Sequence, residues 1–163
     1  MTDLARDILP LWNYGWCDHD SLVVPILNKP EDVISSYINS ESFCTSFVGP
    51  KRDFFPELHG PFFKSLISES DFEQISHQQF NNLLGGLRQP EGFSAPATEG
   101  DWDPVLRLAT EVSARNAWCF KLRPNENDFD RFHEWGSVLE VFREFLFANP
   151  DSEMIERLVF GYD

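Results

Sequence analysis

Histidine, cysteine and acidic residues in close sequence are the first groups in this chain that could carry chemistry. Residues 17–20 (Cys-Asp-His-Asp) place three kinds of metal ligand in four consecutive positions. Neighbouring side chains diverge both in a strand and on a helix, and a zinc site needs further ligands at fixed spacings, which no nearby residue supplies. We therefore interpret these four residues as part of a turn, and we expect the protein to bind neither a metal nor a cofactor.

Two further patterns begin a catalytic motif without completing it. His133-Glu134 starts a zinc-protease sequence, but Ser137 stands where the second histidine is required. Residues 92–96 start a nucleophile elbow that ends in proline where glycine is needed. The sequence therefore assigns no catalytic residue and favours a protein that is not an enzyme. A hydrolase without a recognisable motif, using His59 or His133 as a general base, is the alternative.

Composition indicates one folded, cytoplasmic domain. The chain has 163 residues, of which 15% are aromatic, including 16 Phe. This aromatic content is enough for a substantial core. Cys17, Cys44 and Cys119 are odd in number and make no disulfide framework. The acidic N-terminus does not resemble a signal peptide, and no apolar run is long enough to span a membrane.

The sequence patterns that indicate helices and strands predict an α+β fold. We expect a single domain that is helix-rich with a small sheet. Helices are expected at 2–9, from Pro30, within 70–86, from Asp103 and over 127–147. Strands are expected at 22–24, 42–48 and 117–122, and 155–162 reads as a short helix running into a strand. An irregular surface loop is expected at about 88–102, because that stretch is rich in proline and glycine.

The distribution of charge is the most informative pattern. The formal net charge is −14, which repels nucleic acid and anionic membranes and leaves a basic protein as the natural partner. Acids are concentrated in two segments, 68–103 and 125–163. The second segment sets ten acids against Arg131, Arg143 and Arg157; the acids are Glu126, Asp128, Asp130, Glu134, Glu140, Glu144, Asp151, Glu153, Glu156 and Asp163.

On the predicted helix at 127–147, like charges stand four residues apart. Glu126, Asp130 and Glu134 follow one another at this spacing, as do Glu140 and Glu144. Such pairs destabilise an isolated helix, so the arrangement favours an acidic face that meets a partner. A merely solvated face is the alternative.

A second acidic patch surrounds a tryptophan. Glu99, Asp101 and Asp103 flank Trp102, and aromatic residues set among charges are typical of binding hot spots. We expect Trp102 and Trp135 to be the anchors of the interface. A helix cap at Asp103, with Trp102 folded onto the core, is the alternative.

In its size, acidity and lack of catalytic motifs, the chain resembles the cognate immunity proteins of bacterial toxin–immunity systems, such as those of contact-dependent growth inhibition and polymorphic toxins. The resemblance implies that the protein binds and neutralises a basic toxin domain, commonly a nuclease, by covering the surface that the toxin uses for its substrate. It implies no direct contact with nucleic acid or a membrane. A nucleic-acid mimic that regulates a host or phage enzyme is a further alternative.

Overall fold

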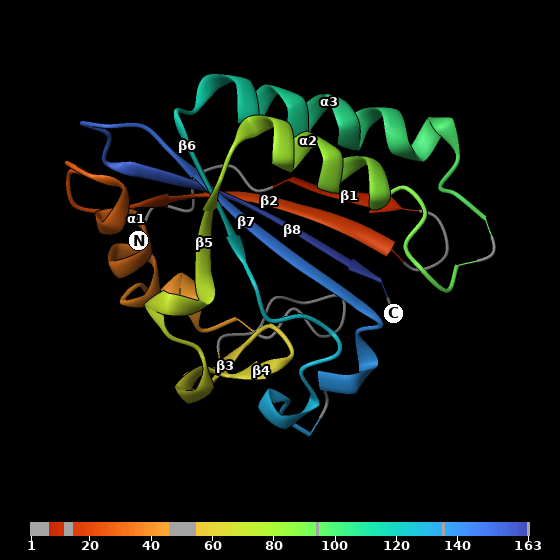
Figure 1. Cartoon of the computed structure of the whole chain (residues 1–163), viewed down its shortest axis with the longest axis horizontal. Coiled ribbons are helices and arrows are strands. Elements are labelled where there is room, and N and C mark those ends of the chain that lie inside the picture. The colour runs from red at the N-terminus through yellow and green to blue at the C-terminus, as the bar shows by residue number, and fades with distance from the viewer. Residues whose placement is uncertain (1–6, 12–14, 46–54, 94, 135, 163) are drawn as a thin grey trace.

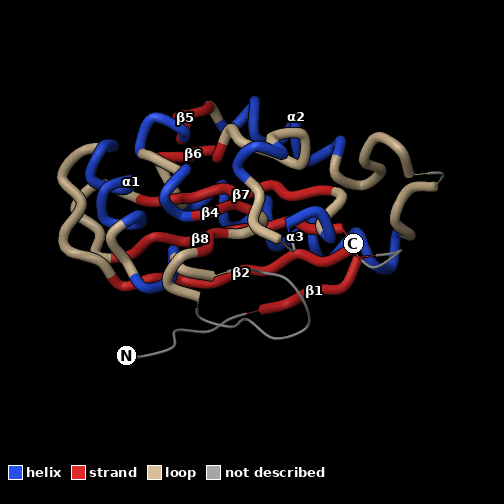
Figure 2. Tube along the Cα trace, turned by 90° about the horizontal axis from the view of Figure 1, so that it is seen from below, coloured by secondary structure: helices blue, strands red, loops and turns tan. Residues whose placement is uncertain are grey.

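The computed structural model describes residues 7–11, 15–45, 55–93, 95–134 and 136–162. Six strands form an antiparallel sheet in the order β1–β2–β8–β7–β6–β5, which Figure 2 shows from one edge to the other. These strands are β1 (Asp7–Leu11), β2 (Gly15–Val23), β5 (Phe72–Ile75), β6 (Trp118–Leu122), β7 (Val141–Ala148) and β8 (Met154–Tyr162). Because β2 from the start of the chain pairs with β8 from its end, both halves of the chain build the same sheet.

Helices cover both faces of the sheet (Figure 1). Helices α2 (His77–Gly86) and α3 (Glu99–Arg115) lie on one face. Helix α1 (Pro30–Ile38) and a small hairpin, β3 (Leu58–His59) and β4 (Phe62–Phe63), lie on the other. Each of the central strands β7 and β8 therefore has apolar side chains on both faces.

The expectation of a helix-rich fold with a small sheet is wrong, because the protein is a sheet-rich α+β structure. A strand buried on both faces reads as a continuous apolar run, which periodicity does not separate from a buried helix. In β7, Phe142 and Leu146 pack on the α1 side while Phe145 and Phe147 pack on the α2–α3 side. The spacing of Phe142 and Leu146 imitates a helical stripe.

The predicted helix at 127–147 accounts for most of this error. Its first part holds only two short 3-10 turns, Phe129–Arg131 and Gly136–Val138, and its second part is β7. A side chain on Gly136 would meet the Pro61 carbonyl oxygen at 2.3 Å, so this glycine is needed for close approach of the two backbones. Because the described residues of this segment do not form an α-helix, the predicted helix face formed by like charges four residues apart does not exist there.

Helices with complete capping patterns occur close to where they are predicted. Helix α2 begins after Ser76, which forms the expected capping box with Gln79. Helix α3 begins four residues earlier than expected because Thr98 caps it, so the irregular segment ends at Thr98. None of the helices in the described part of the chain is long and apolar enough to cross a membrane.

Other short elements differ from the expectations. Residues 7–9 belong to strand β1 rather than to a helix, and 72–75 form β5 after a short 3-10 turn. The predicted strand at 42–48 begins instead as a 3-10 turn at Glu41–Phe43, and its end lies outside the described residues. Residues 154–162 are strand throughout.

Candidate functional site

A network of charged side chains is buried on the α1 side of the sheet. His59 Nε2 lies 2.6 Å from Glu144 Oε2, and its Nδ1 lies 2.8 Å from the Phe43 carbonyl oxygen. The Phe43 carbonyl oxygen can only accept a hydrogen bond, so Nδ1 donates to it, and Nε2 pairs with the Glu144 carboxyl group. The Tyr37 hydroxyl donates to the other oxygen of Glu144. Burial opposes ionisation of Glu144, but the charge and hydrogen bond of His59, with Arg157 and Tyr37, hold its pKa below the usual value.

Arg157 extends the network to strand β2. Its guanidinium donates to both oxygens of Asp20, at 3.0 and 2.9 Å, and to the Tyr37 hydroxyl at 2.8 Å. Burial disfavours its charge, but Asp20 and the other nearby groups raise the pKa of Arg157 above its already high value. Through the pairing of Asp20 with Arg157 and of Glu144 with His59, the network joins strands β2, β7 and β8 to α1 and β3.

Both candidate general bases, His59 and His133, are buried. His59 stands beside a carboxylate, as a hydrolase would require, but the side chains of both His59 and Glu144 have no exposed area. His133 is also buried, and its Nε2 lies 3.0 Å from the Gly60 carbonyl oxygen. In this arrangement each of the two histidines has its buried hydrogen-bonding groups satisfied by other parts of the fold.

The other face of the sheet carries a second ion-pair cluster. Glu156 accepts two hydrogen bonds from Arg115, the nearer of them very short, one from Asn116 at 2.6 Å and one from His19 at 3.1 Å. Burial opposes ionisation of Glu156, but these donors lower its pKa to about 2. The cluster ties the end of α3 to strands β2 and β8.

The run at 17–20 forms part of the central strand β2, not a turn. Cys17 packs into the core on the α2–α3 side, and His19 reaches Glu156 on that same side. Asp20 points the other way, to Arg157. Alternation along the strand thus separates the possible ligands, and no group of three metal-ligating side chains occurs among the residues that the structure describes.

The predicted acidic helix face is dispersed over the fold. Glu144 is buried in the network with His59, and Glu126 forms an ion pair with Arg143, with one N–O distance of 2.9 Å. Burial opposes ionisation of Glu126, but Arg143 holds the pKa of this carboxyl below its usual value. Glu140 is exposed at the start of β7. Asp130 and Glu134 are exposed, in the 3-10 turn Phe129–Arg131 and in the segment that follows it, and Trp135 lies outside the described residues.

The patch around Trp102 forms the first turn of α3. Glu99 and Asp101 occupy positions where carboxylates interact favourably with the helix dipole, and Asp103 is exposed one residue beyond Trp102. Trp102 itself is only 5% exposed and packs in the core with Val105. The alternative in which Trp102 folds onto the core is therefore the arrangement found, and this side chain is not a surface anchor.

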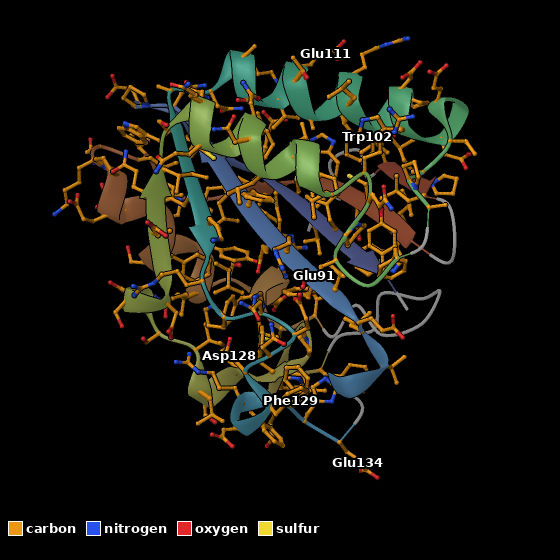
Figure 3. The ribbon with its side chains drawn as sticks, turned by 45° about the vertical axis from the view of Figure 1, so that its right-hand side comes forward. Glu91, Trp102, Glu111, Asp128, Phe129 and Glu134 are labelled. Carbon is orange, nitrogen blue, oxygen red and sulfur yellow. The ribbon has the colours of Figure 1, made fainter. Side chains whose placement is uncertain are left out.

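A different surface combines exposed aromatic and acidic side chains. We call it the hairpin surface and define it by the β3–β4 hairpin and the segment packed beside it. Its members are Glu57, Phe63, Leu66, Phe129, Asp130 and Glu134. Figure 3 shows Phe129 and Glu134 at one end of the molecule, remote from Glu111 on α3.

Backbone geometry brings the two segments of the hairpin surface together. Gly60 turns the chain between β3 and β4 with φ of 54°, and a side chain there would meet the Phe142 ring at 2.5 Å. Phe62 forms an isolated bridge with Phe132, and the Arg131 guanidinium donates to the Leu66 carbonyl oxygen at 3.1 Å. These contacts place residues 129–134 directly beside 60–66.

The apolar members of the hairpin surface are exposed to solvent, and Phe129 is the most exposed large apolar side chain among the described residues. Phe129 is 68% exposed, with its ring centroid 5.4 Å from that of the half-buried Phe132. Leu66 and Phe63 are 44% and 40% exposed, and the Phe63 ring lies 6.3 Å from that of His133. Adjacent exposed aromatic groups that a fold leaves uncovered are typical of interaction surfaces.

Like most exposed acids among the described residues, the carboxylates of this surface form no ion pair. Arg131 pairs with Asp71 at 2.8 Å, which keeps this cation away from Asp130 and Glu134. No ion pair joins Glu57, Asp130 or Glu134 to another residue in the described part of the chain. The surface therefore presents uncompensated negative charge around an aromatic centre.

Sequence reasoning found two members of this surface and missed four. Asp130 and Glu134 were expected on a helix face, whereas Phe129 was not predicted to contact a partner. Glu57, Phe63 and Leu66 carried no motif. The one available signal is the adjacent pair Phe62-Phe63 in a short strand, because alternation sends only one of two neighbours inward.

A scan of the chain against protein-family models, a search of curated proteins and a search of solved structures each found no match.

Proposed function

We propose that this protein binds a basic protein partner through the hairpin surface and inhibits it, in the manner of the immunity proteins that neutralise bacterial toxins. The partner envisaged is a toxin domain that acts on nucleic acid. Such a domain carries cations where the substrate phosphates bind, and the carboxylates of the hairpin surface would occupy those positions.

The observation that carries this proposal is the exposure of Phe129 beside two unpaired carboxylates. Asp130 and Glu134 lie within five residues of an aromatic ring that is 68% exposed. An aromatic anchor supplies affinity through desolvation, whereas surrounding charges steer a partner of opposite charge and accelerate association. The four acids neutralised by arginine elsewhere in the fold cannot contribute in the same way.

The proposed inhibition is competitive. The bound protein covers the cationic surface of the partner, so nucleic acid and inhibitor exclude one another. The protein's net charge of −14 adds long-range attraction, which salt screens over roughly 8 Å at physiological ionic strength. We expect association to slow several-fold between low and physiological salt, with a smaller change in dissociation.

The test compares Phe129→Ser with Val23→Ser as a matched control. Val23 is 66% exposed and pairs with Met154, at the end of strands β2 and β8 opposite the end where the hairpin packs. Tagged wild type and both variants are used to capture proteins from the native host. A captured basic protein is then purified, and its affinity for each variant and its activity on nucleic acid are measured.

We expect Phe129→Ser to weaken binding of the purified partner by about tenfold or more, as loss of a hot-spot aromatic does. Val23→Ser should bind and inhibit as wild type does. Equal affinity of wild type and Phe129→Ser, or a partner whose activity is unchanged in the complex, would contradict the proposal.

A further inference from the structure

A hollow of about 540 Å³ opens beside the hairpin surface and shares Glu57 and Phe63 with it. It lies between the end of α1, the turn before β3 and the segment after β4. Its lining residues are Ile38, Pro56, Glu57, Phe63, Lys64, Ser65 and Ile67. Ile67 is buried and Ile38 is partly buried, so apolar side chains form the inner wall.

Two charged residues line the hollow, Glu57 and Lys64. The ammonium group of Lys64 lies 3.3 Å from Cys44 Sγ and 5.8 Å from the centroid of the Phe43 ring, so it interacts with buried groups of the body. Glu57 is exposed, and within the described ranges it forms no ion pair, even though its backbone carbonyl accepts from the Lys64 amide at 2.8 Å. The hollow thus combines an apolar wall, an aromatic ring and one free carboxylate.

We propose that this hollow binds an arginine side chain of the partner. This inference rests on the proposed function and specifies one contact within it. The methylene groups of an arginine cover apolar surface while its charged head stays at the rim. There the planar guanidinium stacks on Phe63 and donates two hydrogen bonds to the Glu57 carboxylate. Lysine fits less well, because an ammonium is a strongly hydrated point charge that does not stack.

The first experiment tests the hollow without the partner. The probe is the blocked peptide acetyl-Gly-Arg-Gly-amide, titrated into the ¹⁵N-labelled full chain while amide chemical shifts are recorded. Its matched control is the same peptide with citrulline, which keeps the shape of arginine without the charge. We expect millimolar binding, with shifts concentrated at residues 56–57 and 63–67. The citrulline peptide should bind several-fold more weakly.

Variants then assign the contact to Glu57. Glu57→Gln should reduce binding of the arginine peptide up to about fivefold, the range of a solvent-exposed ion pair. Glu111→Gln removes an exposed carboxylate at the other end of the molecule and should change nothing (Figure 3). Shifts spread over all acidic segments, equal binding of the citrulline peptide, or an unaffected Glu57→Gln would each overturn the inference. A lysine peptide that binds as tightly as the arginine peptide would also overturn it.

Failure of this inference is distinguishable from failure of the proposed function. If Phe129→Ser disrupts the complex with the purified partner while Glu57→Gln leaves affinity and peptide binding unchanged, the hairpin surface is the interface and the hollow is not an arginine site. If the peptide binds at the hollow but Phe129→Ser leaves partner affinity unchanged, the arginine site is upheld and the proposed interface is rejected.

Discussion

Glu144 and Glu134 belong to one acidic stretch of sequence but to opposite situations in the fold. Glu144 is fully buried, with His59 and Tyr37 on its two oxygens. Glu134 is exposed on the hairpin surface, where the described residues offer it no cation. The comparison teaches that a net charge of −14 does not say which carboxylates are available to a partner, because some are already neutralised within the structure.

The strongest way to break this comparison is to remove the buried carboxylate. Glu144→Ala leaves the His59 ring and the Tyr37 hydroxyl without their shared hydrogen-bond partner. We expect a loss of about 3–5 kcal/mol in the free energy of unfolding, as when one member of a buried ion pair is deleted. Glu134→Ala, measured by the same urea titration, should change stability by less than about 0.5 kcal/mol. Similar costs for the two variants would contradict the distinction.

Glu156, on the other face of the sheet, is a second buried carboxylate whose contribution to stability can be tested by varying the pH. Because folding lowers the pKa of Glu156 to about 2, the unfolded chain binds its proton more readily. The contribution of Glu156 to the free energy of unfolding is therefore fully present above about pH 4.5 and is lost as the pH falls towards 2. The free energy of unfolding, measured from pH 2 to 6, should fall less steeply in this window for Glu156→Gln than for wild type. Parallel curves would show that this carboxylate is not linked to folding.

An intermediate effect is expected for the partly exposed pair of Glu126 and Arg143. Their side chains are 20% and 26% exposed, so solvent screens the interaction. Glu126→Gln should cost less than about 1 kcal/mol in the free energy of unfolding, and the difference from wild type should shrink in high salt. A cost as large as that of Glu144→Ala would place Glu126 with the buried groups instead.

The smallest effect on stability is expected at the aromatic centre of the hairpin surface. Phe129→Ser removes a ring that is 68% exposed, so the thermal midpoint should stay within a few degrees of wild type. A large decrease would mean that the ring supports the fold, and the loss of binding proposed for this variant would then have a structural cause.

The sequence by itself determined the elements whose signals are local. Ser76 and Gln79 specify the start of α2, and the apolar face from Val105 to Val112 specifies α3, since capping and helical periodicity act within a few residues. The strand near Trp118–Leu122 was also predictable from its composition and the proline that follows it.

Only the tertiary structure decided the state of residues 127–148 and the role of each acid there. Phe142 and Leu146 suit a helix or a strand, and the choice depends on β6 and β8 lying on either side of β7. Once β7 is a strand, Glu144 points to His59, which is 85 residues away in the chain. Such pairings depend on contacts between distant segments, so no local pattern of charge could separate the buried carboxylate from the exposed ones.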